Sequence, residues 1–169
     1  DAVRGINITA TSTTTNIYVY YNTVYLTGTS SGIDFSGSAM YHTYSVSAAN
    51  ANLVMQNNIF VNNMVAKGTG RASAFRRSAA TDLNNYSITS NNNLFFGSTI
   101  YYDGTNTDVT LAAFKARVAP RETLSVSENP TFVSTTGANA TFLHIDPTAP
   151  TYVESGAVNI AGITDDCDS

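Results

Sequence analysis

The stretch NLVMQNNIFVNN (residues 52–63) decides the fold, because it alternates apolar and polar residues like a strand yet carries two asparagines in its middle. Asparagine is uncommon in strands, and burying it without a hydrogen-bond partner costs free energy. Similar stretches occur at residues 16–26 (NIYVYYNTVYL) and 85–96 (NYSITSNNNLFF). Three segments with strand periodicity on both sides of an asparagine indicate an internal repeat.

The repeat has a regular length when it is aligned on Asn22, Asn57 and Asn92, which are spaced 35 residues apart. A third short segment, rich in aromatic or β-branched residues, follows each pair of strands. These third segments occupy residues 32–37, 71–78 and 98–104. Three strands per repeat without intervening helices predict an all-β chain, folded as a right-handed parallel β-helix, a solenoid with three strands per coil.

Stacked coils explain the asparagines. We expect Asn22, Asn57 and Asn92 to lie above one another at one bend, each side-chain amide donating to the next, so that burial leaves no amide unpaired. Asparagine also tolerates the left-handed backbone that a bend needs. The alternative is a meander of antiparallel hairpins in which the asparagine turns are coincidental.

The organisation changes after the repeats. Residues 108–120 contain apolar residues at helical spacing, with Thr110 as N-cap and Pro120 as a stop, which predicts one short helix near 110–118. We therefore expect coils over residues 1–107 and a closing segment over 121–169. Together these make one β-helix domain spanning residues 1–169, a piece of a larger chain.

Composition excludes some classes of partner. The net charge is −4, only 12% of residues are charged, and the basic residues form no cluster that would bind nucleic acid. No run is long and apolar enough for a membrane span. A single cysteine excludes an internal disulfide. Low charge with many threonines and asparagines favours a secreted or cell-surface protein of a bacterium.

Two C-terminal stretches, ENPTFV (residues 128–133) and FLHIDPTAPTYVESGAVNIAGITDD (142–166), resemble the closing segment of right-handed parallel β-helix proteins of the Bacteroidetes. KGTGRASAFRRS (67–78) and LAAFKARVAPRETLSVSENP (111–130) match the same group in order. The resemblance implies a pectin-lyase-like fold and a secreted or surface protein, often with a sorting domain for type IX secretion. Most members have no assigned activity.

The chain departs from this group at its end. Members usually continue with an Asp-aromatic-Asp-Gly-Asp motif, whereas this sequence reads Asp166-Cys167-Asp168-Ser169. With Asp165, the carboxylates of Asp166 and Asp168 are candidate Ca²⁺ ligands, because alternating carboxylates suit a hard cation. A solvated acidic terminus is the alternative interpretation. No other cofactor is expected.

Catalytic candidates are few. A polysaccharide lyase needs a basic residue, and Arg71, Arg76 and Arg77 are the basic residues that lie close together. Alternation places Arg76 on the opposite face from Arg71 and Arg77, and we expect Arg76 to pair with Asp103 on an exposed face. Ion pairs between coils and solvated loop charge are the favoured explanation of this patch, so no catalytic residue is assigned.

Tyrosines provide the remaining functional signal. Tyr21 and Tyr25 are predicted on the face opposite Tyr18 and Tyr20, where their rings would stack on sugars. The sequence therefore favours a non-catalytic module that binds a glycan or mediates adhesion. The alternative is a polysaccharide lyase or glycoside hydrolase of the same fold, active or inactive. Exposed coil ends are strand edges, which favour self-association.

Overall fold

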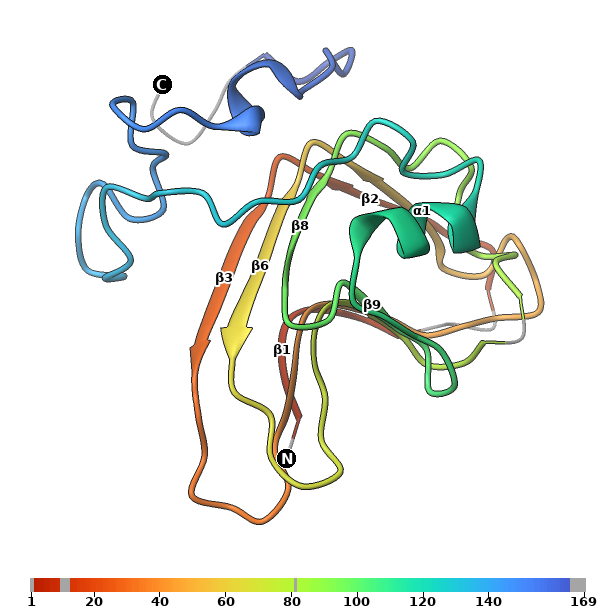
Figure 1. Cartoon of the computed structure of the whole chain (residues 1–169). Coiled ribbons are helices and arrows are strands. Elements are labelled where there is room, and N and C mark those ends of the chain that lie inside the picture. Colours follow the sequence, from red (N-terminus) through yellow and green to blue (C-terminus); the bar gives the residue numbers. More distant parts are fainter. Residues whose placement is uncertain (1, 10–12, 81, 165–169) are drawn as a thin grey trace.

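The computed structural model describes residues 2–9, 13–80 and 82–164, which form a mostly β structure with one short α-helix (Figure 1). Most strands are short, with two to seven residues each. In chain order the elements are β1 (Ala2–Ile8), β2 (Asn16–Tyr20), β3 (Thr23–Gly28), β4 (Ser36–His42), β5 (Asn52–Gln56), β6 (Ile59–Met64), β7 (Ala72–Arg77), β8 (Leu94–Gly97), β9 (Tyr101–Tyr102), β10 (Thr107–Asp108), α1 (Leu111–Val118) and the 3₁₀ turn η1 (Tyr152–Ser155).

The strands form three sheets, and consecutive strands enter these sheets in turn. Strands β2, β3 and β4 each belong to a different sheet, and β5, β6 and β7 then join the same three sheets in the same order. The sheets are β2-β5, β3-β6-β8 and β1-β4-β7-β9-β10. All named pairs are parallel except β9 with β10. Parallel pairing rules out the alternative of antiparallel hairpins for these strands, and it is consistent with a β-helix-like arrangement.

The repeat length differs slightly from the one expected. Tyr18 pairs with Val54 and Tyr20 with Gln56, a spacing of 36 residues, whereas Ile59 pairs with Leu94 at a spacing of 35. The alignment on Asn57 was therefore one residue out of register for the first repeat. Because side chains alternate between faces, this shift reverses the predicted orientation of β2, and Tyr18 is 60% exposed.

The third strand of the first repeat also lies later than predicted. Residues 32–37 were expected to form it, but β4 begins at Ser36 and continues to His42. The preceding residues form a loop, and Asp34 in this loop accepts hydrogen bonds from the backbone and the hydroxyl of Thr69 in the loop below. Strands β7 and β9 lie within the predicted segments.

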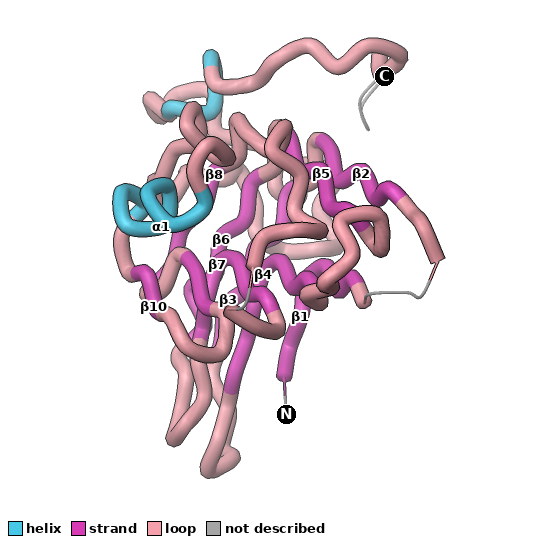
Figure 2. Tube along the Cα trace, turned by 90° about the vertical axis from the view of Figure 1, so that its right-hand side faces the viewer, coloured by secondary structure: helices cyan, strands magenta, loops and turns pink. Residues whose placement is uncertain are grey.

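One aromatic core lies between the three sheets and the helix. Phe60 and Phe95 of adjacent strands pack with tilted rings, their centroids 5.7 Å apart, and Phe75 from another sheet stacks on Phe95 at 6.3 Å. Phe114 of α1 completes the cluster, 5.3 Å from Phe95 and 5.1 Å from Tyr101. The helix therefore covers one end of the stacked strands, as two perpendicular views show (Figures 1 and 2).

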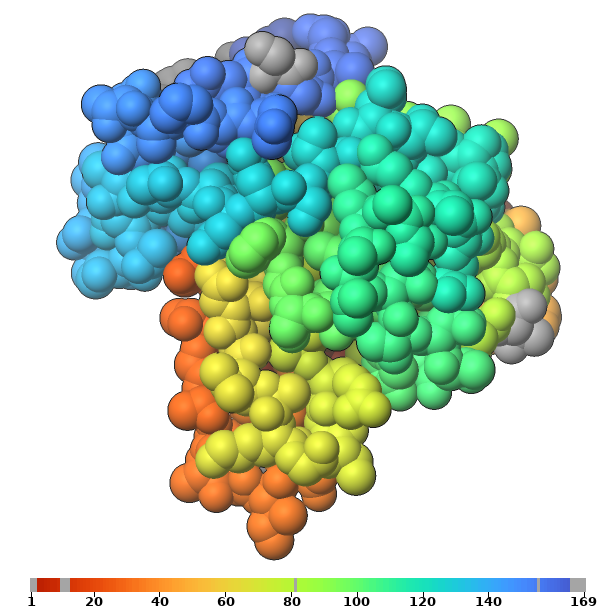
Figure 3. Space-filling view, in the orientation of Figure 1, coloured from red at the N-terminus to blue at the C-terminus, as the bar shows by residue number. Residues whose placement is uncertain are grey.

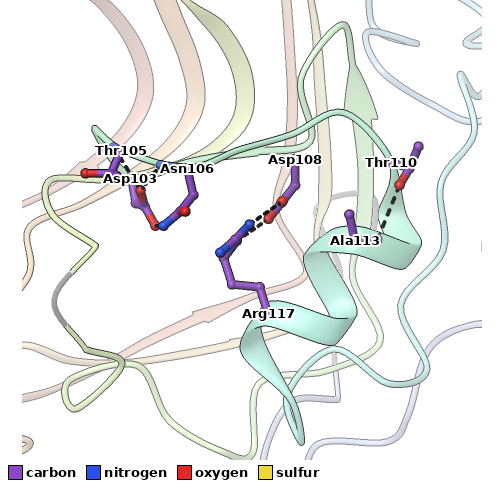
Figure 4. Close-up of polar contacts among 7 residues, drawn as sticks. All are labelled: Asp103, Thr105, Asn106, Asp108, Thr110, Ala113 and Arg117. Carbon is purple, nitrogen blue, oxygen red and sulfur yellow. Dashed lines mark hydrogen bonds and ion pairs between the residues drawn. The ribbon is translucent and has the colours of Figure 1, made fainter.

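The helix confirms its sequence signals. It spans Leu111–Val118, and the hydroxyl of Thr110 accepts a hydrogen bond from the backbone of Ala113 at 3.2 Å. Arg117 holds the helix to β10 through two hydrogen bonds to the Asp108 carboxylate, at 2.6 and 2.7 Å (Figure 4). The helix is thus capped at its start and anchored by an ion pair at its end.

The chain after the helix crosses the molecule to sheet β3-β6-β8 and covers the upper part of its outer face in the view of Figure 3. Ile59, Val61 and Leu94 on that face are buried, and side chains from the later segment pack on them. These covering side chains are Val126, Phe132, Ile145 and Val153. The C-terminal segment therefore buries an apolar outer face that would otherwise meet water.

Candidate functional site

Side-chain amides form a ladder, but its members differ from the predicted set. The amide of Asn22 donates to Asn58 Oδ1 at 3.1 Å, and the amide of Asn58 donates to Asn93 Oδ1 at 2.8 Å. The asparagine ladder is therefore Asn22, Asn58 and Asn93. The prediction was right for Asn22 and wrong for Asn57 and Asn92, because consecutive asparagines left the register ambiguous by one residue.

Tyr21, Asn57 and Asn92 occupy the position just before each ladder residue and form what we call the corner row. All three have a left-handed backbone, with φ of 54°, 59° and 58°. Asparagine adopts this conformation readily, whereas tyrosine does so rarely. The left-handed residue turns the chain between two sheets, and it directs the side chain away from the ladder.

The corner row binds the backbone of the C-terminal segment. The Asn57 side chain donates to the Val158 carbonyl at 2.7 Å and accepts from the Val158 amide at 2.9 Å. Tyr21 donates its hydroxyl to the same carbonyl at 2.9 Å, and Asn92 donates to the Gly156 carbonyl at 2.9 Å. Segments more than 60 residues apart in sequence are thus joined by side-chain-to-backbone hydrogen bonds.

A pocket of about 230 Å³ lies between the corner row and the C-terminal segment. Its wall is largely apolar, with contributions from Ile59, Leu94, Leu124, Val126 and Val153. Asn57 and Asn92 line one side and the exposed ring of Tyr152 lines the other. A mostly apolar cavity with a few convergent polar groups is the usual form of a binding pocket.

The two tyrosines predicted to bind a glycan are partly engaged by this segment. Tyr21 is 45% exposed, but its hydroxyl is bonded to Val158. Tyr25 is half-buried and packs edge-on against Phe132, with ring centroids 5.6 Å apart. The sequence carried no signal that the chain after the helix would return over this face. Tyr21 and Tyr25 therefore do not form a free strip.

The predicted charged patch is divided between the interior and the surface. Arg77 is fully buried, and its guanidinium donates to the Asp82 carbonyl and to Asn85 Oδ1, both at 2.6 Å. Arg71 is exposed and donates to the Gly70 carbonyl at 3.0 Å. Only Arg76 is half-exposed on the sheet, so alternation correctly separated Arg76 from Arg77.

Asp103 does not pair with Arg76 as expected. Its carboxylate is buried and accepts from the backbone amides of Thr105 and Asn106 at 3.1 and 2.7 Å and from the Asn106 side chain at 3.0 Å (Figure 4). Burial raises the pKa of Asp103, but these hydrogen bonds outweigh it and leave the pKa below its usual value. The carboxylate closes a turn rather than serving the exposed face.

Arg76 instead takes part in a row of alternating arginines and tyrosines. Tyr41, Arg76 and Tyr102 are in register on adjacent strands β4, β7 and β9. The Arg4 guanidinium carbon lies 3.5 Å from the centre of the Tyr41 ring, and that of Arg76 lies 5.9 Å from Tyr41 and 5.2 Å from Tyr102. We call Arg4, Tyr41, Arg76 and Tyr102 the arginine–tyrosine row.

The arginine–tyrosine row is a partly exposed polar surface with aromatic rings. All four side chains are half-buried. Arg4 donates to Asn7 Oδ1 at 2.9 Å, and within the described residues the one ion pair found is Arg117 with Asp108. Cation–π attraction orders guanidinium groups beside aromatic rings. The Nε atom of Arg76 is buried without a hydrogen-bond partner in the part of the chain that the structure describes, so its terminal nitrogens are the groups that remain to bind another molecule.

The sequence alone did not predict that the four residues of the arginine–tyrosine row lie together. Alternation within the strand predicts that Arg76 faces outward. The alignment of the row depends on the register between β4 and β7, which the misplaced third strand concealed. Arg4 precedes the first repeat, so no periodic signal linked it to Tyr41.

Buried titratable groups lie behind these surfaces. His42 is fully buried, with Nε2 2.9 Å from the Ala51 carbonyl and 3.2 Å from the Asn85 amide. Burial, assisted by the charge of Arg77, lowers the pKa of His42 to about 4. The imidazole is therefore neutral at physiological pH and has a structural role in the core.

Glu122 is also fully buried and accepts hydrogen bonds from Tyr86, Asn93 and Ser125. Burial raises its pKa despite these hydrogen bonds, and burial together with the Glu122 charge raises the pKa of Tyr86. Arg121 lies 5.4 Å over the Tyr86 ring and donates to the Tyr86 carbonyl. Neither Glu122 nor Arg121 was singled out from the sequence, since isolated charged residues in a loop carry no periodic signal.

Metal ligands are not found in the described part of the chain, where no group of three or more His, Cys, Asp or Glu side chains converges. The candidate Ca²⁺ ligands Asp165, Asp166 and Asp168 lie outside the described residues. Among residues 2–9, 13–80 and 82–164, no helix is long and apolar enough to cross a membrane.

No family model, curated protein or solved structure matches the chain.

Proposed function

We propose that the three parallel sheets are the faces of a right-handed parallel β-helix with three strands per coil. The order in which consecutive strands enter the sheets supports this. So does the asparagine ladder, which needs successive turns of the chain stacked at about 4.8 Å. On this proposal Asn22, Asn58 and Asn93 mark the same corner of three successive coils.

The function we propose is that of a non-catalytic module of a secreted or cell-surface bacterial protein, which binds a glycan on the arginine–tyrosine row. The observation that carries this is the register of Tyr41, Arg76 and Tyr102 on one half-exposed face, with Arg4 stacked on Tyr41. Tyrosine rings stack on sugar rings, and guanidinium and hydroxyl groups bond sugar oxygens.

The two guanidinium groups favour a glycan with acidic groups. Arg4 and Arg76 make no ion pair with any carboxylate of the described residues. A carboxylate or sulfate on a sugar would supply a bidentate partner for either one. The net charge of −4 opposes distant attraction of such a polymer, so we expect recognition to depend on close contact and to weaken in salt.

Self-association through strand edges remains part of the proposal. Strands β1, β2 and β3 each end their sheets, and an unpaired strand edge accepts another strand. Light scattering of the chain over a range of concentrations tests this. A mass that rises with concentration is expected, and a constant monomer mass would contradict it.

The functional proposal is tested by screening the chain against neutral and acidic oligosaccharides and, in parallel, measuring ultraviolet absorbance after incubation with uronic-acid polymers. We expect binding to acidic glycans, loss of that binding in the double variant Arg4→Gln/Arg76→Gln, and no new absorbance. Unsaturated products would show elimination and contradict the non-catalytic assignment. Equal binding by the double variant would contradict the location of the site.

A further inference from the structure

We propose that the corner row and the pocket beside it form a binding site for a peptide backbone, which the chain's own residues 156–158 occupy here. The site is distinct from the arginine–tyrosine row and does not depend on glycan binding. It lies at the corner between β5 and β6, where Asn57 adopts its left-handed conformation.

The contacts have the chemistry of peptide capture. Asn57 donates to the carbonyl and accepts from the amide of the same residue, Val158, so its side chain satisfies both backbone hydrogen-bonding groups of one residue. Asn92 bonds the Gly156 carbonyl two residues earlier. Gly156 is the C-cap of η1, with φ −86° and ψ −17°, so the corner row holds the backbone where the chain leaves the 3₁₀ turn.

These contacts recognise backbone groups and do not depend on the side chains of the bound segment. All four hydrogen bonds from the corner row reach the backbone of Gly156 or Val158, so another sequence with the same conformation can make them. Val158 itself is 37% exposed. The affinity of this segment for the row therefore comes from polar contacts and from its attachment to the same chain.

The pocket offers an apolar wall for a side chain larger than that of Ala157. The segment contributes only Gly156 and Ala157 to a wall that is otherwise rich in Ile, Leu and Val side chains. A peptide with a large apolar residue at the position of Ala157 would bury that side chain against Ile59, Leu94 and Val153. Leucine in place of alanine adds about three methylene equivalents, which corresponds to up to about 50-fold in affinity.

A peptide is favoured over a sugar because of the wall's composition. The pocket lining contains no charged side chain, and the polar groups of Asn57 are already matched to the backbone groups of one residue. The partner class that follows is a segment of another protein, with a large apolar side chain placed between two backbone contacts.

The test uses the full chain and a fluorescently labelled peptide with the sequence of residues 154–162 carrying Ala157→Leu. The variant Val158→Pro weakens the internal contact, because proline has no amide hydrogen to donate to Asn57, although the hydrogen bonds to the backbone carbonyls can still form. We expect saturable anisotropy with this variant, and binding at least tenfold weaker when Asn57→Asp is added. Aspartate keeps the shape and tolerates the left-handed backbone, but cannot donate. Asn63→Asp is the matched control and should leave binding unchanged.

A second measurement needs no variant. In the unaltered chain, the labelled peptide should displace the internal segment, and hydrogen exchange at the Val158 amide should accelerate. A peptide with the same residues in scrambled order should have no effect. Unsaturable binding, equal affinity with and without Asn57→Asp, or competition by a neutral oligosaccharide but not by unlabelled peptide would overturn the proposal.

Discussion

The side-chain amide of Asn93 donates to both carboxylate oxygens of Glu122, at 2.9 and 3.2 Å, and so ends the asparagine ladder on a buried acid. Asn22 donates to Asn58, and Asn58 donates to Asn93, so every amide in the ladder points toward Glu122. Aligned donors strengthen one another in a low-dielectric interior, and an acceptor with several lone pairs is a suitable end.

The ladder should contribute strongly to stability. Asn58 is 1% exposed and also donates to the Val19 and Gln56 carbonyls, so Asn58→Ala leaves several buried groups unpaired. We expect a loss of about 2–4 kcal/mol in the free energy of unfolding. Urea unfolding measures it. Asn63→Ala is the control, because Asn63 is half-buried and makes one 3.3 Å bond to Asn129, and should change stability by less than about 0.5 kcal/mol. Equal losses would contradict the special position of Asn58.

Glu122 should make the protein less stable as the pH rises. Its folded-state pKa lies above the unfolded value of 4.5, so the folded state holds the proton longer. The free energy of unfolding should therefore fall as the pH rises from about 4.5 through the raised pKa. Glu122→Gln stays neutral and should lack this component. Urea midpoints at several pH values, compared between wild type and Glu122→Gln, measure the difference. Parallel pH profiles would contradict the assignment.

His42 should act in the opposite direction. Its pKa is about 4 in the folded state and 6.5 in the unfolded state, so the unfolded chain binds the proton first as the pH falls. Stability should be fully present above pH 6.5 and decline toward pH 4, by about 3 kcal/mol from this residue alone. His42→Gln should flatten the decline. An unchanged slope between wild type and variant would show that another group titrates.

The helix depends on its ion pair. Asp108 is largely buried, whereas Arg117 is about one-third exposed, so Arg117→Ala leaves a buried carboxylate without its cation. We expect a loss of about 1–2 kcal/mol, below the range for a fully buried pair because water reaches the arginine side. Lys115 on the same helix is half-buried and donates to the Thr123 carbonyl at 2.9 Å, so Lys115→Ala should cost less than Arg117→Ala, under about 1 kcal/mol. Thermal unfolding compares the two, and a larger effect at Lys115 would contradict the anchoring role.

Much of the architecture follows from local sequence signals. Period-two alternation beside Asn22 and Asn57 indicated strands, and Thr110 with Pro120 set the limits of the helix. These features depend on contacts within a few residues. The exact register does not, because adjacent asparagines at positions 57–58 and 91–93 fit the ladder equally well in sequence. The pairing of Ile17 with Leu53 and of Val19 with Met55, which turns these side chains toward the core, fixes the register that selects Asn58.

The candidate surfaces were harder to predict for the same reason. The contact between Asn57 and Val158 joins residues 101 positions apart, and no periodicity connects them. Likewise, Arg4 meets Tyr41 only after β1 pairs with β4. Sequence alternation predicted correctly that Arg76 and Arg77 face opposite sides, since alternation within one strand is a local property.

The most direct test of the proposed function is calorimetric titration of an acidic oligosaccharide into three proteins: wild type, Arg76→Gln and Arg71→Gln. Arg76 lies between Tyr41 and Tyr102, whereas the Arg71 guanidinium bonds only carbonyls of Thr69 and Gly70 among the contacts found in the described residues. Binding at the arginine–tyrosine row predicts at least a tenfold loss of affinity for Arg76→Gln and no loss for Arg71→Gln. Equal affinity of all three proteins, or a loss confined to Arg71→Gln, would contradict it.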